Sequence, residues 1–355
     1  MFNKKLMFVV TILIAASFVL TSCANAATPA AATTAAPATA APAKSITVAV
    51  VAGGEVGDMG FIDSANEGLK KMESELGVKT VMIQTRSDTT VYLDSLISAA
   101  EQADVIFVIP GYFFDEQLKQ VVPQYPDKMF VYVDGSTDIA GMTSVSFKQN
   151  EGAFLAGALA ALMTTDTTDL QYADSAKTIA FMGGADMAVI HDYQVGFDQG
   201  AKYAVADINV IDKYAGNHFD AVLGKETALS LYEQGADIIF QAAGPTGVGV
   251  FEAAKDAKKY VIGVDSDQKS LAPEYTLASM RKNVGDVIYL FTKQYLNGEI
   301  TLGNSYAYGL AENGVGIDYS TIAPDLVPQA IKDQIEQYKQ DIISGKIVVD
   351  TYKAE

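Results

Sequence analysis

SITVAVVAGGEVGDMGFIDSANEG, residues 45–68, is the stretch that decides the fold of this chain. Residues 46–51 form an apolar run typical of a buried strand, and the run ends at Gly53-Gly54. A loop follows, and a helix is predicted from Ser64. The loop carries two carboxylates and one aromatic ring: Asp58, Asp63 and Phe61. This arrangement leaves space for a polar small molecule at the carboxyl end of the strand. We therefore expect half of a ligand-binding cleft here, with the other half supplied beyond Asn150.

The rest of the chain repeats the pattern of strand followed by helix. Apolar runs rich in Val and Ile predict strands at residues 46–51, 81–84, 105–109, 129–133, 143–147, 178–182, 209–214, 237–241, 260–264 and 275–280. Apolar residues three and four apart predict helices at residues 64–76, 92–103, 115–122, 151–163, 188–205, 225–234, 247–257, 284–296 and 326–344. Such alternation is typical of an α/β protein whose parallel sheets are covered by helices on both faces.

The alternation restarts near residues 148–151, which predicts two lobes of similar composition. We expect an N-terminal lobe at 45–148, a C-terminal lobe at 149–280, a return segment to the N-terminal lobe at 281–310, and a C-terminal helix and tail at 311–355. Two such lobes joined by hinge strands resemble a Venus-flytrap binding protein. In that arrangement the ligand lies between the lobes and closure buries it.

The N-terminus is typical of a secretion signal. Lys4 and Lys5 precede an apolar run at residues 6–20, which is shorter than the roughly 20 residues of a membrane-spanning helix. The run ends in LTSC (residues 20–23), which resembles the lipobox of bacterial lipoproteins. We therefore expect a signal peptide at residues 1–22 and a lipid on Cys23. An ordinary signal peptide with a chance cysteine is the alternative.

Residues 24–44 contain almost only Ala, Thr and Pro and are expected to form a tether. Together with a lipidated Cys23, the tether (23–44) would hold the folded part at the extracytoplasmic face of the cell membrane. Cys23 is the only cysteine, so an internal disulfide is excluded. No second apolar run reaches spanning length, so this chain is not itself a channel or permease.

Composition narrows the class of partner. The chain has 355 residues, 49% of them hydrophobic and 19% charged, which fits a soluble protein of about two domains. Its net charge is −18, and −20 without residues 1–22, which hold two lysines and no acid. Such a surface disfavours nucleic acid and anionic lipid headgroups.

Polar and aromatic residues follow each predicted strand. In the first lobe these are Asp58, Phe61, Asp63, Tyr112, Phe113, Asp115 and Asp134; in the second they are Gly183, Gly184, Asn217, His218, Phe219, Asp220, Gly244, Thr246, Gly247, Asp265 and Asp267. Aromatic faces stack on rings, carboxylates accept hydrogen bonds from hydroxyl groups, and glycines let backbone amides come close. The pattern predicts a cleft for a polar, neutral ligand with a ring and several hydroxyls.

Purely structural roles remain open for most of these residues. Phe61 can be the hydrophobic staple of a helix, Asp63 can cap a helix from Ser64, and Asp115 can cap its own helix. Asp265 and Asp267 can be turn residues. The run GPTGVG (residues 244–249) can be a tight turn, and it is not the G-x-G-x-x-G dinucleotide fingerprint.

Catalytic and metal-binding patterns are poor. The two histidines, His191 and His218, lie far apart in sequence, and no G-x-S-x-G, P-loop, H-E-x-x-H or D-x-D-x-D-G pattern occurs. We therefore expect no enzyme activity, no metal and no cofactor.

Six stretches carry a family resemblance: GDMGFIDSANEGLK (57–70), FVIPGYFFDE (107–116), SFKQNEGAFLAGALAALMT (146–164), ALSLYEQGADIIFQAAGPTGVGVFEAAK (228–255), VIGVDSDQ (261–268) and SMRKNVGD (279–286). Through them the chain resembles the basic membrane protein (BMP) family of bacterial lipoproteins, which includes purine-nucleoside receptors of ABC importers. The resemblance covers roughly residues 46–310. It implies the type I periplasmic-binding fold, with each lobe a parallel sheet flanked by helices and a nucleoside bound between the lobes.

The resemblance also implies roles for particular residues. Phe61 and Phe219 match the two phenylalanines that hold the base. Asp265 and Lys282 match the groups that hold the ribose hydroxyls, helped by the Gly244 loop, and Lys282 is expected to face Asp265 and keep it ionised. The other expected ligand contacts, all from the first lobe, are Asp58, Tyr112 and Asp115.

Two positions depart from the family pattern. The family often has Asp nine residues before the first phenylalanine, where this chain has Ala52, and Asn directly after it, where this chain has Ile62. Both polar groups help to read the edge of the base, so their loss affects the choice of ligand rather than the fold.

We therefore expect a lipid-anchored receptor that binds a nucleoside, with purine as the leading base, and docks on a permease and an ATPase encoded separately. One alternative keeps the cleft but changes the ligand to another small polar metabolite. Another is a sensory or surface lipoprotein with no transport role.

Overall fold

The computed structural model describes residues 46–166, 170–171, 173 and 176–353. All of them belong to one compact unit, Lys44–Glu355. The predicted signal peptide, Cys23 and the tether lie outside the described residues. Within the described ranges, none of the helices is both long enough and apolar enough to span a bilayer.

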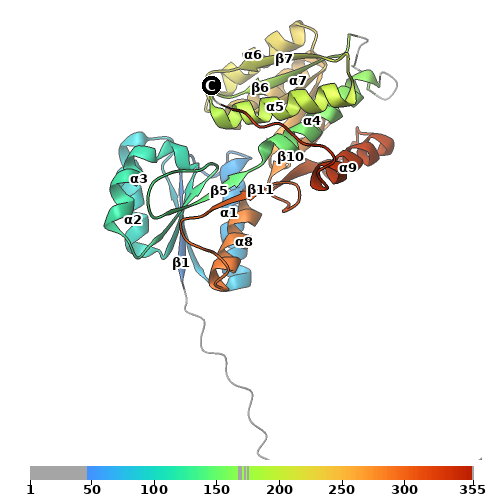
Figure 1. The fold of residues 1–355 in the computed structure, drawn as a ribbon. Coiled ribbons are helices and arrows are strands. Elements are labelled where there is room, and N and C mark those ends of the chain that lie inside the picture. The colour runs from blue at the N-terminus through green and yellow to red at the C-terminus, as the bar shows by residue number, and fades with distance from the viewer. Residues whose placement is uncertain (1–45, 167–169, 172, 174–175, 354–355) are drawn as a thin grey trace, which may run out of the picture. The chain divides into compact units, whose positions relative to one another are not determined.

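The first of two sheets has six strands in the order β11-β5-β4-β3-β1-β2, and every neighbouring pair is parallel. Its strands are β1 (Thr47–Ala52), β2 (Lys79–Gln84), β3 (Val105–Ile109), β4 (Met129–Val133), β5 (Met142–Phe147) and β11 (Ser305–Tyr308). Its helices are α1 (Phe61–Leu76), α2 (Tyr92–Gln102), α3 (Asp115–Val121) and α8 (Val284–Leu296). In Figure 1, α2 and α3 cover one face of this sheet and α1 and α8 cover the other. Val, Ile and Phe fill the central strands, which are buried on both faces.

The second sheet also has six strands, in the order β12-β10-β9-β8-β6-β7, and only its edge pair β10–β12 is antiparallel. Its strands are β6 (Thr178–Gly183), β7 (Asn209–Tyr214), β8 (Ile238–Ala242), β9 (Tyr260–Asp265), β10 (Thr276–Lys282) and β12 (Val315–Asp318). Its helices are α4 (Gln149–Thr165), α5 (Ala188–Ala204), α6 (Ala221–Glu233) and α7 (Val248–Ala257). The last helix, α9 (Gln329–Ile343), packs against α4. The predicted α/β class with two parallel sheets flanked by helices is confirmed.

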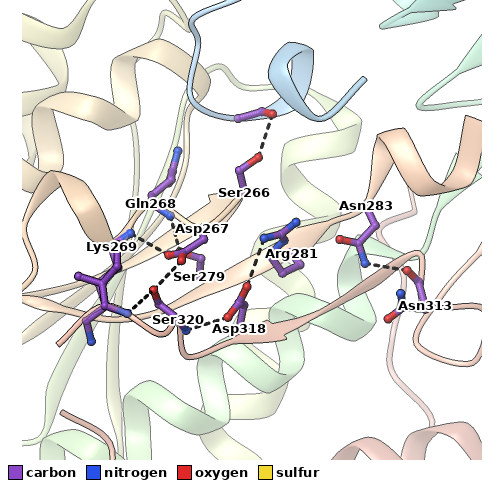
Figure 2. Close-up of polar contacts among 12 residues, drawn as sticks. Ser266, Asp267, Gln268, Lys269, Ser279, Arg281, Asn283, Asn313, Asp318 and Ser320 are labelled. Carbon is purple, nitrogen blue, oxygen red and sulfur yellow. Dashed lines mark hydrogen bonds and ion pairs between the residues drawn. The ribbon is translucent and has the colours of Figure 1, made fainter. Parts of the chain in front are cut away.

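The chain passes between the sheets after β5, after β10 and after β11. Hydrogen bonds join these passages to one another. The amide of Lys148 donates to the carbonyl of Tyr308 at 3.0 Å, and that of Asn283 donates to Gly314 at 2.9 Å. The side-chain amide of Asn283 also donates to the carbonyl of Asn313 at 2.7 Å (Figure 2). Three hydrogen-bonded connections side by side are a hinge of the kind that lets two lobes close on a ligand.

Two predicted helix starts are wrong by a few residues. Helix α1 begins at Phe61 rather than Ser64, and α6 begins at Ala221 rather than residue 225. In both, an aspartate just before the helix sets the start. Asp58 accepts hydrogen bonds from amides in the first turn of α1, and Asp220 accepts from the amides of the first turn of α6.

Helices α4 and α5 approach each other unusually closely. An ideal Cβ on Gly200 would lie 1.9 Å from the carbonyl oxygen of Phe154, and one on Gly157 would lie 2.0 Å from that of Phe197. Only glycine fits such backbone contacts. Helix α4 has no polar face because it is buried between α5 and the second sheet. The short side chains of its many alanines allow this close packing.

Candidate ligand-binding site

A cleft of about 510 Å³ is lined by residues from the strand ends of both sheets. Its volume lies in the range of small-molecule sites. Seven of the eight residues predicted to contact a ligand line it: Asp58, Phe61, Tyr112, Phe219, Gly244, Asp265 and Lys282. Their contacts with a ligand stay a prediction, but the structure does bring them together.

The eighth residue, Asp115, lies elsewhere. It is the first residue of α3 and lines a separate hollow together with Tyr132, whose hydroxyl donates to it at 2.9 Å. Burial and this hydrogen bond raise the pKa of Tyr132. The structure therefore gives the Asp115 carboxylate a partner inside its own lobe, away from the cleft.

One polar contact of the cleft is a buried ion pair between the two halves. Lys282, the last residue of β10, donates to the carboxylate of Asp134, directly after β4, and both side chains are buried. Three aromatic rings surround the ammonium, with centroids 5.1–5.4 Å away: Phe61, Phe147 and Tyr193. The expected partner of Lys282 was Asp265, and the structure corrects this: the direct partner is Asp134.

Asp265 ends β9 in the left-handed backbone region, with φ 65°, which is uncommon for a residue other than glycine. Burial raises the pKa of Asp265 to about 7; Lys282 opposes this less strongly, and Asp58 and Asp134 add smaller effects in the direction of burial. The expectation that Lys282 keeps Asp265 ionised is therefore wrong. Near neutral pH this carboxyl is present in both forms, so it can donate a hydrogen bond to a ligand or accept one.

The two carboxylates on either side of Phe61, Asp58 and Asp63, shape the backbone around it. Asp58 accepts hydrogen bonds from the amides of Gly60, Ile62 and Asp63 at 2.8–3.0 Å. Asp63 lies inside α1 and reaches back to the amides at residues 57 and 59, so it does not cap a helix from Ser64. Burial raises the pKa of Asp58, although its three amide donors favour the charged form.

The opposite half holds this loop by two further hydrogen bonds. Ser266 Oγ donates to the carbonyl of Gly60 at 3.1 Å, and Figure 2 shows Ser266 reaching the N-terminal segment, in blue. Gln268 Nε2 donates to the carbonyl of Met59 at 3.1 Å. Its Oε1 accepts from Gln241 Nε2 and from the amide of residue 264. Gln268 thereby ties the Phe61 loop to the interior of the second sheet.

Aromatic rings face the cleft from both halves. Phe219 is about half exposed, and its ring lies 6.5 Å from that of Phe113 in the first half. Tyr112 packs edge-on against Phe113, and burial near Asp134 raises its pKa well above the usual value. The Tyr112 hydroxyl therefore stays protonated and can donate a hydrogen bond.

The loop of Phe219 is fixed to the turn that contains Gly244. The amide of Asp220 donates to Thr246 Oγ1 at 2.8 Å, and the amide of Thr246 donates to the carbonyl of His218 at 3.0 Å. Gly244 itself has φ 56°, in the left-handed region that favours glycine. The turn therefore needs a glycine and also positions one aromatic wall of the cleft.

The lining residues that sequence reasoning missed include Glu55 and two further groups. One is on α5: Val189, Ile190 and Tyr193. Their spacing on a helix that follows Gly183-Gly184 was the available signal. The other is the pair Arg86 and Ser87, directly after β2, whose backbone conformation the sequence does not reveal.

The two positions that depart from the family pattern have different surroundings. Ile62 lines the cleft, whereas Ala52 is fully buried at the end of β1. The part of the chain that the structure describes contains no cluster of three or more His, Cys, Asp or Glu that could bind a metal.

Comparison with known proteins agrees with this architecture. A protein-family model described as "ABC transporter substrate-binding protein PnrA-like" (Bmp) matches residues 45–353. Basic membrane protein A2 of Borrelia garinii subsp. bavariensis is 32% identical over 312 residues, which span 85% of this chain and 87% of that protein. The CD4+ T-cell-stimulating antigen of Listeria innocua is 31% identical over 362 residues, which span 96% of each.

Among solved structures, an ABC transporter system solute-binding protein from Aeropyrum pernix K1 superposes with a TM-score of 0.76 and 25% identity, covering 87% of this chain and 94% of that chain. The match extends over both sheets, so the two-lobe periplasmic-binding fold is shared and not only one half of it.

Proposed function

Because this chain belongs to the Bmp family of PnrA-like ABC transporter substrate-binding proteins, we propose that it is a nucleoside receptor of an ABC importer. Members of this family and the matching solved structure are substrate-binding components rather than enzymes. An importer partner follows from the family. The more specific proposal is that the ligand is a nucleoside, and it is argued from the residues that line the cleft.

One observation carries the proposal: the cleft has an aromatic part and a buried polar part. Phe61 and Phe219 supply ring faces from the two halves, which suits a flat heterocycle. Lys282, Asp134 and Asp265 gather donors and acceptors at the buried end, which suits the hydroxyls of a sugar. A nucleoside is a ligand that has both parts.

The polar end also argues against a phosphorylated ligand. Asp58, Asp134 and Asp265 place three carboxyl groups around a single lysine in the described part of the cleft lining. A phosphate would be repelled by this local excess of acid, whereas neutral hydroxyls are not.

A calorimetric and thermal-shift panel of nucleosides, free bases, sugars and nucleotides on the full chain tests the proposal. A ligand at a hundred times its Kd stabilises the folded state by about 2.7 kcal/mol. Phe219→Ala should abolish the shift with a nucleoside, whereas Leu302→Ala, which removes an exposed apolar side chain outside the cleft lining, should leave it unchanged. No response to any nucleoside would contradict the proposal.

A second candidate keeps the importer but changes the ligand. Ile62 lines the cleft where a nucleoside reader often has a polar side chain. Because an apolar side chain forms no hydrogen bond to a base edge, this position does not select a nucleoside over another heterocyclic or sugar-like metabolite. A response to sugars alone in the same panel would favour this candidate.

The site of action is part of the proposal. We place the folded part at the extracytoplasmic face of the cell membrane, held by a lipid on Cys23 and the tether of residues 24–44. Metabolic labelling with a radioactive fatty acid tests this: Cys23→Ala should remove both the label and membrane retention.

A further inference from the structure

Arg86 and Ser87 occupy an unusual backbone conformation at the cleft. Their φ angles are 54° and 61°, in the left-handed region, and neither residue is glycine. Residues held in this region persist only where the surrounding structure imposes it, and such strain is concentrated at functional sites. Both residues line the cleft.

The strained pair is fastened to the loop after β1. The amide of Arg86 donates to the carbonyl of Gly54 at 3.2 Å. Both the amide and Oγ of Ser87 donate to the carbonyl of Gly53, at 3.0 and 3.2 Å. The turn is therefore held against the glycine loop directly after Ala52, the position where nucleoside readers of the family often have an aspartate.

Arg86 also forms an ion pair with Glu55 on the same loop, with 3.2 Å between Nε and Oε2. Both side chains are more than half exposed, and both residues line the cleft. The bond uses Nε, and among the described residues the structure records no hydrogen-bond partner for the two terminal guanidinium nitrogens. These donors and the second Glu55 oxygen remain available to a ligand.

The backbone that carries the pair passes Ile62, where a base edge is expected: Glu55 follows Gly54 directly, and the amide of Arg86 is bonded to the Gly54 carbonyl. An ideal Cβ on Gly54, the neighbour of Glu55, would lie 3.4 Å from Cγ1 of Ile62. One arginine and one glutamate thus line the same cleft as Ile62 and are attached to the loop that follows Ala52, the two positions where this chain departs from the family's polar pattern.

We propose that Arg86 and Glu55 together read a base edge on which an oxo group stands beside a ring N–H, and so select guanosine and inosine over adenosine. This rests on the proposed nucleoside function and names the class of nucleoside. A guanidinium donates two parallel hydrogen bonds to the O6 and N7 acceptors of such a purine, and a carboxylate accepts from the adjacent N1–H.

Adenosine presents the opposite pattern at two of these atoms. Its exocyclic amino group donates where O6 would accept, and its N1 accepts where N1–H would donate. The arginine then faces a donor and the glutamate faces an acceptor, and such mismatches cost affinity because both partners are left unpaired. The same logic favours uridine, with O4 beside N3–H, over cytidine.

Isothermal titration of the full chain with guanosine, inosine and adenosine tests the inference. The unmodified protein should bind guanosine and inosine about tenfold or more tightly than adenosine. Arg86→Met should weaken guanosine binding by about this factor and leave adenosine unchanged or improved, and Arg86→Lys, which keeps the charge without the planar fork, should recover only part of the preference. Glu55→Gln should also reduce the preference.

Lys119→Met is the matched control, because Lys119 is an exposed, ion-paired cation of the same lobe that does not line the cleft. It should change no affinity. Equal binding of guanosine and adenosine by the unmodified protein, or a full preference retained in Arg86→Met, would overturn this inference and leave the nucleoside function standing. Failure of the unmodified protein to bind any nucleoside would overturn both.

Discussion

The hydroxyl of Ser266 donates a hydrogen bond of 3.1 Å to the carbonyl of Gly60, so the loop that leads into Phe61 is held from the opposite half of the molecule. Gln268 adds a second bond, to the carbonyl of Met59. Phe61, one of the aromatic rings around the ammonium of Lys282, is therefore positioned by both halves together. Any movement of one half relative to the other must break these bonds or carry the loop with it.

Gln268→Leu is predicted to lower the free energy of unfolding by about 2 to 3 kcal/mol. Gln268 is almost fully buried, and its loss leaves Gln241 and the Met59 carbonyl without their partner. Urea denaturation with matched m-values measures the difference.

Ser266→Ala is the milder companion variant, since it removes one partly buried hydrogen bond and should cost about 1 kcal/mol. If Gln268→Leu were no less stable than Ser266→Ala, the buried amide network of Gln268 would contribute no more to stability than the single hydrogen bond of Ser266, and the prediction would be wrong.

Lys282→Met is predicted to cost about 3 to 5 kcal/mol and to abolish ligand binding. The substitution leaves the carboxylate of Asp134 buried and unpaired, which is strongly destabilising. Thermal unfolding and calorimetry report the two effects separately.

The double variant Lys282→Met/Asp134→Asn separates stability from binding. Removing both charges should restore most of the stability, and asparagine suits the left-handed φ of 72° at position 134. Binding should stay absent, because the ammonium is missing. Recovery of full affinity in the double variant would show that Lys282 does not contact the ligand.

Much of the fold could be predicted because each buried strand has a clear apolar run. The edge strands β11 and β12 were missed: each has four residues and a mixed polar sequence, and each is fixed by pairing with a distant partner, β5 and β10. The early start of α1 was missed because a carboxylate three residues upstream, Asp58, satisfies its first amides. Such pairing and capping partners depend on tertiary structure.

Most of the expected cleft residues could be placed from the sequence, but Asp115, the contribution of α5 and the pairings inside the cleft could not. Residues at strand ends converge in a parallel sheet, so Phe61, Phe219 and Asp265 were placed correctly at one cleft. Which carboxylate meets Lys282 depends on how the two halves are oriented, and sequence spacing does not contain that information. The strained turn at Arg86 was invisible for a similar reason: a left-handed φ at a residue other than glycine is imposed by its surroundings.

Gly200→Ala is predicted to destabilise the protein by about 2 kcal/mol or more, although alanine favours a helix by about 1 kcal/mol. The new methyl group would overlap the carbonyl oxygen of Phe154 and push α5 away from α4. Gly316→Ala, at a position with open space around it, should change the stability by less than about 0.5 kcal/mol. Chemical denaturation of both variants makes the comparison, and equal stability would contradict the tight helix contact.

Asp265 should make both stability and binding depend on pH. Its pKa in the folded state is about 7, above the ordinary value of 3.8, so between about pH 4 and pH 7 the folded state holds a proton that the unfolded chain has lost. The stability contribution of this group therefore falls as pH rises through that window. Asp265→Asn should remove this pH dependence. The free energy of unfolding of the variant, relative to that of the unmodified protein, should therefore increase from pH 4 to pH 8, by up to about 4 kcal/mol.

Asp198→Asn is the matched control for binding. Burial raises the pKa of Asp198 to about 7 as well, but this residue is on α5 and does not line the cleft. Its substitution should alter the stability profile in the same direction and leave ligand affinity unchanged at every pH. Asp265→Asn should instead weaken the binding of a hydroxyl-bearing ligand most at pH 8, where the unmodified carboxylate is charged and accepts more strongly. If both variants bound equally well across this range, Asp265 would have no contact with the ligand, and the polar end of the cleft would reduce to Lys282 and Asp134.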